Sequence, residues 1–148
     1  MENDKYNLER FIKAQNEIYC DVIKQLKNGY KETHWIWYIF PQLKGLGRSE
    51  YSNIYGIENI EEAVAYAKNK ILWDRYLECC NILLNLKDFT IYEILGFIDS
   101  IKFCSSLTLF YEVTKLPILK NLLFKYFGGN RCEITLNKIR DFKNKNVW

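Results

Sequence analysis

The amino-acid sequence is poor in histidine and has no closely spaced metal-binding cysteine pair. Its 148 residues include a single histidine, His34, and five cysteines, none of which belongs to a Cys-x-x-Cys pair. A structural metal site needs a tight group of cysteine and histidine ligands, so we expect no metal and no cofactor. An odd number of unpaired cysteines is typical of reduced thiols inside the cell, which favours a cytoplasmic protein.

Long apolar runs and blocks of like charge are also missing. No stretch resembles a signal peptide or an apolar span of about 20 residues, so we expect no membrane partner. The 21 basic and 18 acidic residues are interspersed and leave a formal net charge of +3. Without a basic stripe, duplex nucleic acid is not an expected partner. The sequence leaves the oligomeric state open.

Aromatic residues are abundant, with 4 tryptophans, 11 tyrosines and 9 phenylalanines. A chain of this length buries about 70% of the surface that its unfolded form exposes, which predicts one domain over residues 1–148. Apolar residues recur at three- and four-residue intervals, and no segment alternates with period two. We therefore predict an all-α fold, a single compact domain of about eight helices.

Start and stop residues place these helices. Two long amphipathic helices are predicted at residues 7–27 and 70–86. Shorter helices are expected from Thr33 to Pro41, from Ser49 to Tyr55, onward from Asn59, from Thr90 to Gly96, from Asp99 to Lys115, from Pro117 to Gly128 and from Ile134 to Phe142. Within the first helix, Gln15 shares an otherwise apolar face, so its amide requires a polar partner.

The stretch HWIWYIFPQLKGLGRSE, residues 34–50, is the first candidate for a binding site. Gly45 and Gly47 precede a predicted helix start at Ser49, and such a loop can turn successive N–H groups inward around an anion. Ordinary tight turns use the same glycines, so both interpretations stay open. The neighbouring Arg48 and Ser49 favour the anion.

Three ring-bearing residues open the same stretch. His34 lies one residue past the expected cap Thr33, where the helix dipole favours a neutral imidazole that could act as a general base or as a structural hydrogen-bonding group. Trp35 and Trp37 point about 200° apart on a helix, so both cannot face one core layer. One of them is a candidate for stacking on a ring-shaped ligand; packing of both rings between helices is the alternative.

The segment of residues 99–110 is the second candidate. It carries hydroxyl groups on Ser105, Ser106 and Thr108 inside a strongly apolar helix. Lys102 precedes the serines by one turn, and together they could hold a phosphate or a carboxylate. Serines that bond to carbonyls one turn back at a close helix crossing explain the same pattern equally well.

Many of these residues occur together in a known family. The shared residues are Arg10-Phe11, Ala14-Gln15, Tyr19, Gly29, Lys31, His34-Trp35, Trp37, Phe40-Pro41-Gln42-Leu43, Gly45-Leu46-Gly47, Ser49, Tyr55, Ile57, Lys102, Ser105-Ser106-Leu107-Thr108-Leu109-Phe110, Phe127-Gly128-Gly129 and Thr135-Leu136. From about Leu8 to Ile139 the chain resembles the family called domain of unknown function 1810, sometimes labelled calpastatin. The resemblance implies a single all-helical domain and brings no established activity. Where the family has an acidic residue shortly after the double glycine, this chain has Cys132.

The resemblance joins the two candidate segments into one signature. It implies a common cleft between helices, formed by Arg10, Gln15, Lys31, His34, Trp35, Gln42, Arg48, Lys102, Ser105 and Ser106. Cations and glycine N–H groups beside aromatic faces suit an anionic, nucleotide-derived molecule: a nucleotide, a cyclic nucleotide or an ADP-ribose-like compound. We therefore expect a small-ligand-binding domain.

Two other functions stay open. A hydrolase of an N-glycosidic or phosphate bond would use His34 and needs a carboxylate beside the pocket, for which Asp99, Glu50 and Glu32 are the candidates. We assign Asp99 and His34 as the catalytic residues of that alternative. A protein-interaction module would instead place Trp35 or Trp37 on a flat, open surface.

Overall fold

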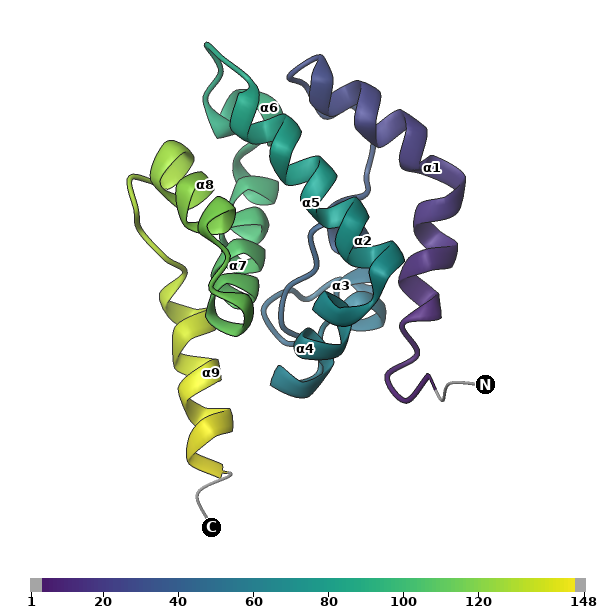
Figure 1. Ribbon diagram of the computed structural model, residues 1–148, viewed down its shortest axis with the longest axis vertical. Coiled ribbons are helices and arrows are strands. Elements are labelled where there is room, and N and C mark those ends of the chain that lie inside the picture. The colour runs from purple at the N-terminus through teal and green to yellow at the C-terminus, as the bar shows by residue number, and fades with distance from the viewer. Residues whose placement is uncertain (1–3, 146–148) are drawn as a thin grey trace.

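The computed structural model describes residues 4–145, and over this range the chain forms nine α-helices and no strand (Figure 1). The helices are α1 (Glu9–Lys27), α2 (Ile36–Ile39), α3 (Glu50–Tyr55), α4 (Ile60–Lys68), α5 (Lys70–Asn85), α6 (Ile91–Leu95), α7 (Phe97–Thr114), α8 (Pro117–Phe127) and α9 (Glu133–Lys145). The prediction of one compact all-α domain is confirmed. None of the described helices is long and apolar enough to cross a membrane.

Four helices begin at a side chain that caps them. Ser49, Asn59, Asn69 and Thr90 each accept a hydrogen bond from the backbone N–H three residues later, at the starts of α3, α4, α5 and α6. These bonds satisfy N–H groups that a helix leaves without an internal partner. Glu93 completes a capping box by accepting a hydrogen bond from the Thr90 N–H at 2.9 Å. The helix starts predicted at Ser49, Asn59 and Thr90 are therefore built by local hydrogen bonds, and Asn69 does the same for α5.

The predicted start of the long helix α7 is wrong. The helix begins at Phe97, and Gly96 takes the cap position with a φ of +85°. Glycine adopts this conformation without the steric cost of a Cβ. Asp99 therefore lies within the first turn of α7 and does not cap it.

The predicted cap of α2 is also wrong, because a side chain of α1 binds the preceding segment. Thr33 does not cap the helix; its hydroxyl accepts a hydrogen bond from the Gln25 amide at 2.9 Å. The side-chain oxygen of Gln25, Oε1, accepts hydrogen bonds from the Glu32 N–H and the Trp35 indole N–H, both at 2.9 Å. The helix consequently begins at Ile36.

Helix α7 lies at the centre of the fold and contacts α2, α4, α6, α8 and α9. Figure 1 shows α5 between α1 and the pair formed by α7 and α8, in agreement with the contacts of α5 with α1 and α8. The core around α7 is aromatic, with paired ring centroids between 4.6 and 6.4 Å apart among Phe40, Tyr66, Tyr76, Phe103 and Phe110. Tilted and edge-on ring pairs of this kind add to the stabilisation from apolar burial.

Two serines of α7, Ser105 and Ser106, pair with hydroxyl groups of neighbouring helices. Ser106 Oγ lies 2.8 Å from the Tyr76 hydroxyl on α5, and Ser105 Oγ lies 2.7 Å from Thr135 Oγ1 on α9. All four side chains are buried. Because each hydroxyl finds its partner inside the protein, the pairs connect α7 to α5 and α9 without leaving a polar group unsatisfied.

Candidate functional site

The larger of two adjoining hollows lies between the segment that follows α1 and the start of α7. Its volume is about 540 Å³. Its lining residues are Lys31, Glu32, Thr33, His34 and Trp37 from the first segment and α2, and Leu95, Gly96, Phe97, Ile98, Asp99 and Lys102 from α6, α7 and their junction. A concavity of this size between helices is a common place for a small-molecule site.

Asp99 lies between the two lysines of this larger hollow. Its Oδ2 atom is 2.7 Å from Lys31 Nζ, and its Oδ1 atom is 3.9 Å from Lys102 Nζ. The Lys31 side chain is only 6% exposed, and its ammonium also lies 5.1 Å from the centre of the Trp35 ring. A nearly buried ammonium needs a close partner, so the Lys31–Asp99 ion pair holds the segment after α1 against α7.

Lys102 has more freedom than Lys31. Its side chain is 19% exposed, and among residues 4–145 its ammonium makes one loose ion pair, with Asp99, and no hydrogen bond. An ammonium carries three donors, so Lys102 can bind an additional acceptor. No side chain caps the nearby start of α7, whose backbone N–H groups give this end of the helix a partial positive charge.

The smaller hollow, of about 220 Å³, shares Ile98 and Lys102 with the larger one. Its other lining residues are Gln42, Leu46, Gly47, Ile101, Ser105, Cys132 and Ile134. Ile98, Ile101 and Ile134 are 67%, 52% and 61% exposed, and a contiguous exposed apolar surface is typical of a binding site. Lys102 therefore stands between a charged hollow and an apolar one.

The structure brings eight of the predicted site residues to these hollows. Lys31, His34, Trp37, Asp99 and Lys102 line the larger hollow, and Gln42, Gly47 and Ser105 line the smaller one. His34 is exposed, whereas Trp37 is partly buried and stacks on Tyr51 with ring centroids 4.9 Å apart. The Trp37 indole N–H is buried and finds no hydrogen-bond partner in the described range.

The glycine loop is explained by packing. Gly45 has a φ of +94°, and Gly47 lies so close to Ser52 that a Cβ would collide with that side chain. Ser49 uses its hydroxyl to cap the six-residue helix α3. Gly45, Arg48 and Ser49 line neither hollow. Of the loop, only Leu46 and Gly47 reach a hollow, the smaller one.

Arg10 belongs to a different part of the structure. One of its N–H groups donates to Glu62 Oε2 at 2.8 Å, and the others donate to the backbone carbonyls of Tyr6, Asn7, Ile54 and Gly56. All five guanidinium donors are thereby used. Arg10 connects α1 to α3 and α4 and has no donor left for a ligand, which corrects its predicted place in the cleft.

Gln15, Trp35 and Ser106 also require correction, because each is at most 1% exposed and lines neither hollow. The Gln15 amide donates to the Tyr38 carbonyl at 2.6 Å and accepts from Arg75 at 3.2 Å, which supplies the partner that its position in α1 requires. The three side chains lie in the core, out of reach of a ligand. Trp35 is for the same reason no exposed hot spot for a protein partner.

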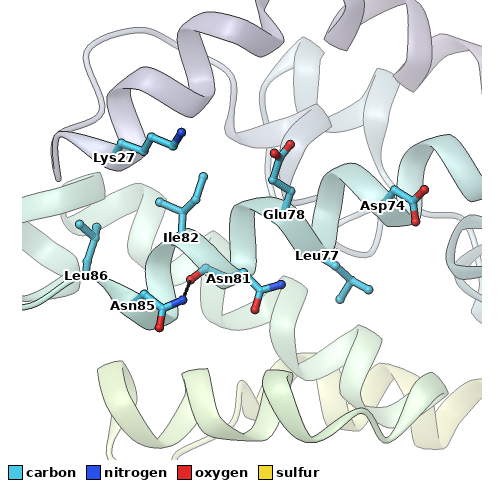
Figure 2. A pocket seen from close by; sticks show the side chains of 8 residues that line it. All are labelled: Lys27, Asp74, Leu77, Glu78, Asn81, Ile82, Asn85 and Leu86. Atoms are coloured by element: carbon cyan, nitrogen blue, oxygen red, sulfur yellow. Dashed lines mark hydrogen bonds between the residues drawn. The ribbon is translucent and has the colours of Figure 1, made fainter.

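A third hollow, of about 670 Å³, lies along the outer side of α5 near α1 (Figure 2). Figure 2 shows Glu78 and Ile82 on the side that faces α1, whereas Leu77 and Asn81 point away from it. The Asn85 amide donates to the Asn81 carbonyl at 2.9 Å. In a ligand site the polar groups converge on a common point, whereas the polar groups of this hollow do not. The two hollows that meet at Lys102 are the better candidate.

Within residues 4–145 the thiols and carboxylates form no metal-binding cluster. Burial raises the pKa of the Cys104 thiol to about 11 and that of Cys79 to about 12, so both stay protonated and unreactive near neutral pH. In the part of the chain that the structure describes, no three His, Cys, Asp or Glu side chains gather closely enough to hold a metal ion.

The sequence did not predict the apolar residues that line the smaller hollow. Ile98, Ile101 and Ser105 recur at helical spacing, which is the signal of a shared face. Helix α7 is apolar on nearly all sides, however, so its sequence does not distinguish the face toward the core from the face toward the smaller hollow. Leu46 and Ile134 come from distant segments and carry no signal of their own.

Comparison with known proteins places the chain in a family. A family model described as "Protein of unknown function (DUF1810)" matches residues 5–139. The chain belongs to the DUF1810 family. It is similar to the conserved hypothetical protein Rv1873 from Mycobacterium tuberculosis, whose crystal structure gives a TM-score of 0.89 at 40% identity over 90% of this chain and 96% of that chain. No match is found among curated proteins. The fold is therefore that of DUF1810, and a function has to be argued from the hollows.

Proposed function

We propose that this DUF1810 protein binds a small anionic, nucleotide-derived molecule where its two hollows meet. The observation that carries the proposal is the position of Lys102, which lines both hollows and makes no hydrogen bond within residues 4–145. A largely buried cation with free donors at the meeting point of two concavities suits an anionic group better than a neutral one.

The other charges of the larger hollow agree with this interpretation. The two lysines face a single carboxylate, that of Asp99, and the uncapped start of α7 adds a partial positive charge. Glu32 also lines this hollow but is exposed, where solvent screens its charge. The interior of the larger hollow therefore favours a negative group near Lys102.

The apolar walls of the smaller hollow support a ligand that also has a ring. A nucleotide combines an anionic sugar phosphate with a planar base, and the two hollows offer a charged and an aliphatic environment side by side. We assign the sugar phosphate to the larger hollow and the base to the smaller one. Mononucleotides and ADP-ribose-like compounds share this chemistry.

The proposal is tested by calorimetry and thermal shift with adenosine 5′-monophosphate (AMP), ADP-ribose and a cyclic nucleotide. Binding raises the melting temperature with ligand concentration. We expect Lys102→Met to weaken binding at least tenfold. The matched control is Lys120→Met, which removes an exposed lysine of α8 outside both hollows. Equal affinity of Lys102→Met and the unmodified protein would overturn the proposal, as would the absence of any shift at millimolar concentrations.

Hydrolysis of the bound molecule is a second candidate, because His34 and Asp99 line the same hollow. An imidazole and a carboxylate are the groups that activate water in such reactions. Asp99 is engaged by Lys31 at 2.7 Å, so His34 is the better candidate for the base. Chromatography of the bound nucleotide after incubation detects turnover. His34→Gln is then expected to abolish product formation without a loss of affinity, and an unchanged nucleotide leaves binding as the function.

A further inference from the structure

The side-chain amide of Gln42 is a polar group of the smaller hollow that is available for a ligand. Among the described residues its amide makes no hydrogen bond, although its backbone is held firmly: the Gln42 carbonyl accepts the Ile57 N–H at 2.9 Å, and Leu43 forms a bridge with Ile57. The amide nitrogen packs beside Gly47, 3.5 Å from the position that a Cβ would occupy there. A fixed backbone thus presents an unused amide to the hollow.

The other polar groups of this hollow are less available. The Ser105 hydroxyl is paired with Thr135 at 2.7 Å, and Lys102 lies at the boundary with the larger hollow. The remaining walls are mostly aliphatic. A ring that enters the smaller hollow would therefore cover the exposed isoleucines with its faces and meet the Gln42 amide with its edge.

We propose that Gln42 recognises the edge of an adenine ring seated in the smaller hollow, so that the ligand class of the proposed site is the adenine nucleotides. A glutamine amide presents one donor and one acceptor side by side, which matches the amino group and the adjacent ring nitrogen of adenine. This inference rests on the proposed function, because the phosphate of the same nucleotide would be bound by Lys102.

Guanine fits this environment less well. Its edge can also pair with an amide, but its additional amino group would then face the aliphatic side chains of Leu46, Ile101 and Ile134 without a partner. Burial of an unpaired polar group is unfavourable. Replacement of the amide by a carboxylate changes the pattern to two acceptors, which opposes adenine and suits the neighbouring N–H donors of guanine. Gln42→Glu should consequently reverse the preference.

The test compares three probes by isothermal titration calorimetry: AMP, guanosine 5′-monophosphate (GMP) and ribose 5-phosphate. For the unmodified protein we expect AMP to bind at least tenfold tighter than either of the others. Gln42→Ala should remove the advantage of AMP over GMP, reduce but not abolish its advantage over ribose 5-phosphate, because the isoleucines still cover the ring, and leave the affinity for ribose 5-phosphate unchanged. Gln42→Glu should lower the ratio of AMP affinity to GMP affinity at least tenfold.

Asn137→Asp is the control for the added charge, because Asn137 is an exposed residue of α9 that lies outside the smaller hollow. It should leave the ratio of AMP to GMP affinity unchanged. If AMP and ribose 5-phosphate bind equally well, or if Gln42→Ala keeps the preference for AMP over GMP, the role of Gln42 is overturned while the anion site stands. If none of the three probes binds, the inference and the proposed function both fail.

Discussion

The Lys31 ammonium lies 2.7 Å from the Asp99 carboxylate, in an ion pair that joins the segment after α1 to the first turn of α7. The backbone of the same segment is held against α6, since the Lys31 N–H donates to the Ile94 carbonyl at 2.7 Å. The pair thereby sets the distance between the two walls of the larger hollow. It also holds Asp99 beside Lys102, so the anchor proposed for the ligand depends on it for its position.

We expect Asp99→Asn to destabilise the protein by about 2 kcal/mol, because it leaves two lysines without their carboxylate. Lys31→Met should lower the free energy of unfolding by less, because the methionine side chain fills the space of the buried lysine methylenes. Asp99 also keeps Lys102 as a partner at 3.9 Å. Lys102→Met should cost least. Urea denaturation measures the free energy of unfolding of each variant. Equal costs for all three would show that Asp99 is not the centre of the cluster.

Gln25 is expected to contribute strongly to stability although it lies outside the hollows. Its amide makes hydrogen bonds with the Thr33 hydroxyl, the Glu32 N–H and the Trp35 indole N–H, each at 2.9 Å. Gln25→Met would leave the buried Trp35 indole N–H without a partner, whereas water can reach the exposed Glu32 and Thr33, so we expect a cost of about 2 kcal/mol. Thermal denaturation of this variant and of Thr33→Val, which removes only one of the bonds, should show a clearly smaller loss for Thr33→Val.

The sequence predicted most helices because their ends carry local signals. Asn59 and Thr90 cap helices with their own side chains, and Pro117 opens α8 at a position where its missing N–H is not needed. Asp99 is a residue type that often caps helices, so the sequence points to it as the start of α7. The actual cap is Gly96, and its role depends on a backbone conformation that the residue type alone does not indicate.

The candidate site was only partly predictable, because the same residue type serves a ligand or the core according to its tertiary surroundings. Lys31 and Lys102 reach the larger hollow, but the equally polar Gln15 is bound to the Tyr38 carbonyl within the core. Arg10 is fully occupied by Glu62 and backbone carbonyls. Such partners come from segments far apart in the chain, and periodicity on one helix does not identify them.

The buried hydroxyl pair of Ser106 and Tyr76 should behave as one unit. Tyr76→Phe leaves the Ser106 hydroxyl without its partner on α5, and we expect a loss of about 1 kcal/mol in the free energy of unfolding. Ser106→Ala should cost a similar amount. The double variant should cost clearly less than the sum of the two, since the second change removes a group that is already unpaired. Additive costs in a double-mutant cycle would contradict the pairing.

Alkaline pH should destabilise the protein through its buried thiols. Burial raises the pKa of Cys104 to about 11 and that of Cys79 to about 12, from an ordinary value of 9.0. Below pH 9 both thiols are protonated in the folded and in the unfolded protein, so the protein keeps its full stability there. Above pH 9 the unfolded chain releases the thiol protons first, so stability falls as the pH rises toward 11. Over the range from pH 8 to pH 11 the shift of Cys79 alone corresponds to a loss of about 2–3 kcal/mol, and the partly exposed Cys104 adds a smaller share because solvent screens it. We therefore expect a total loss of about 3–4 kcal/mol, measured by urea denaturation. In Cys104→Ala the decrease with pH should be shallower, whereas Cys20→Ala, which removes an exposed thiol, should keep the slope of the unmodified protein.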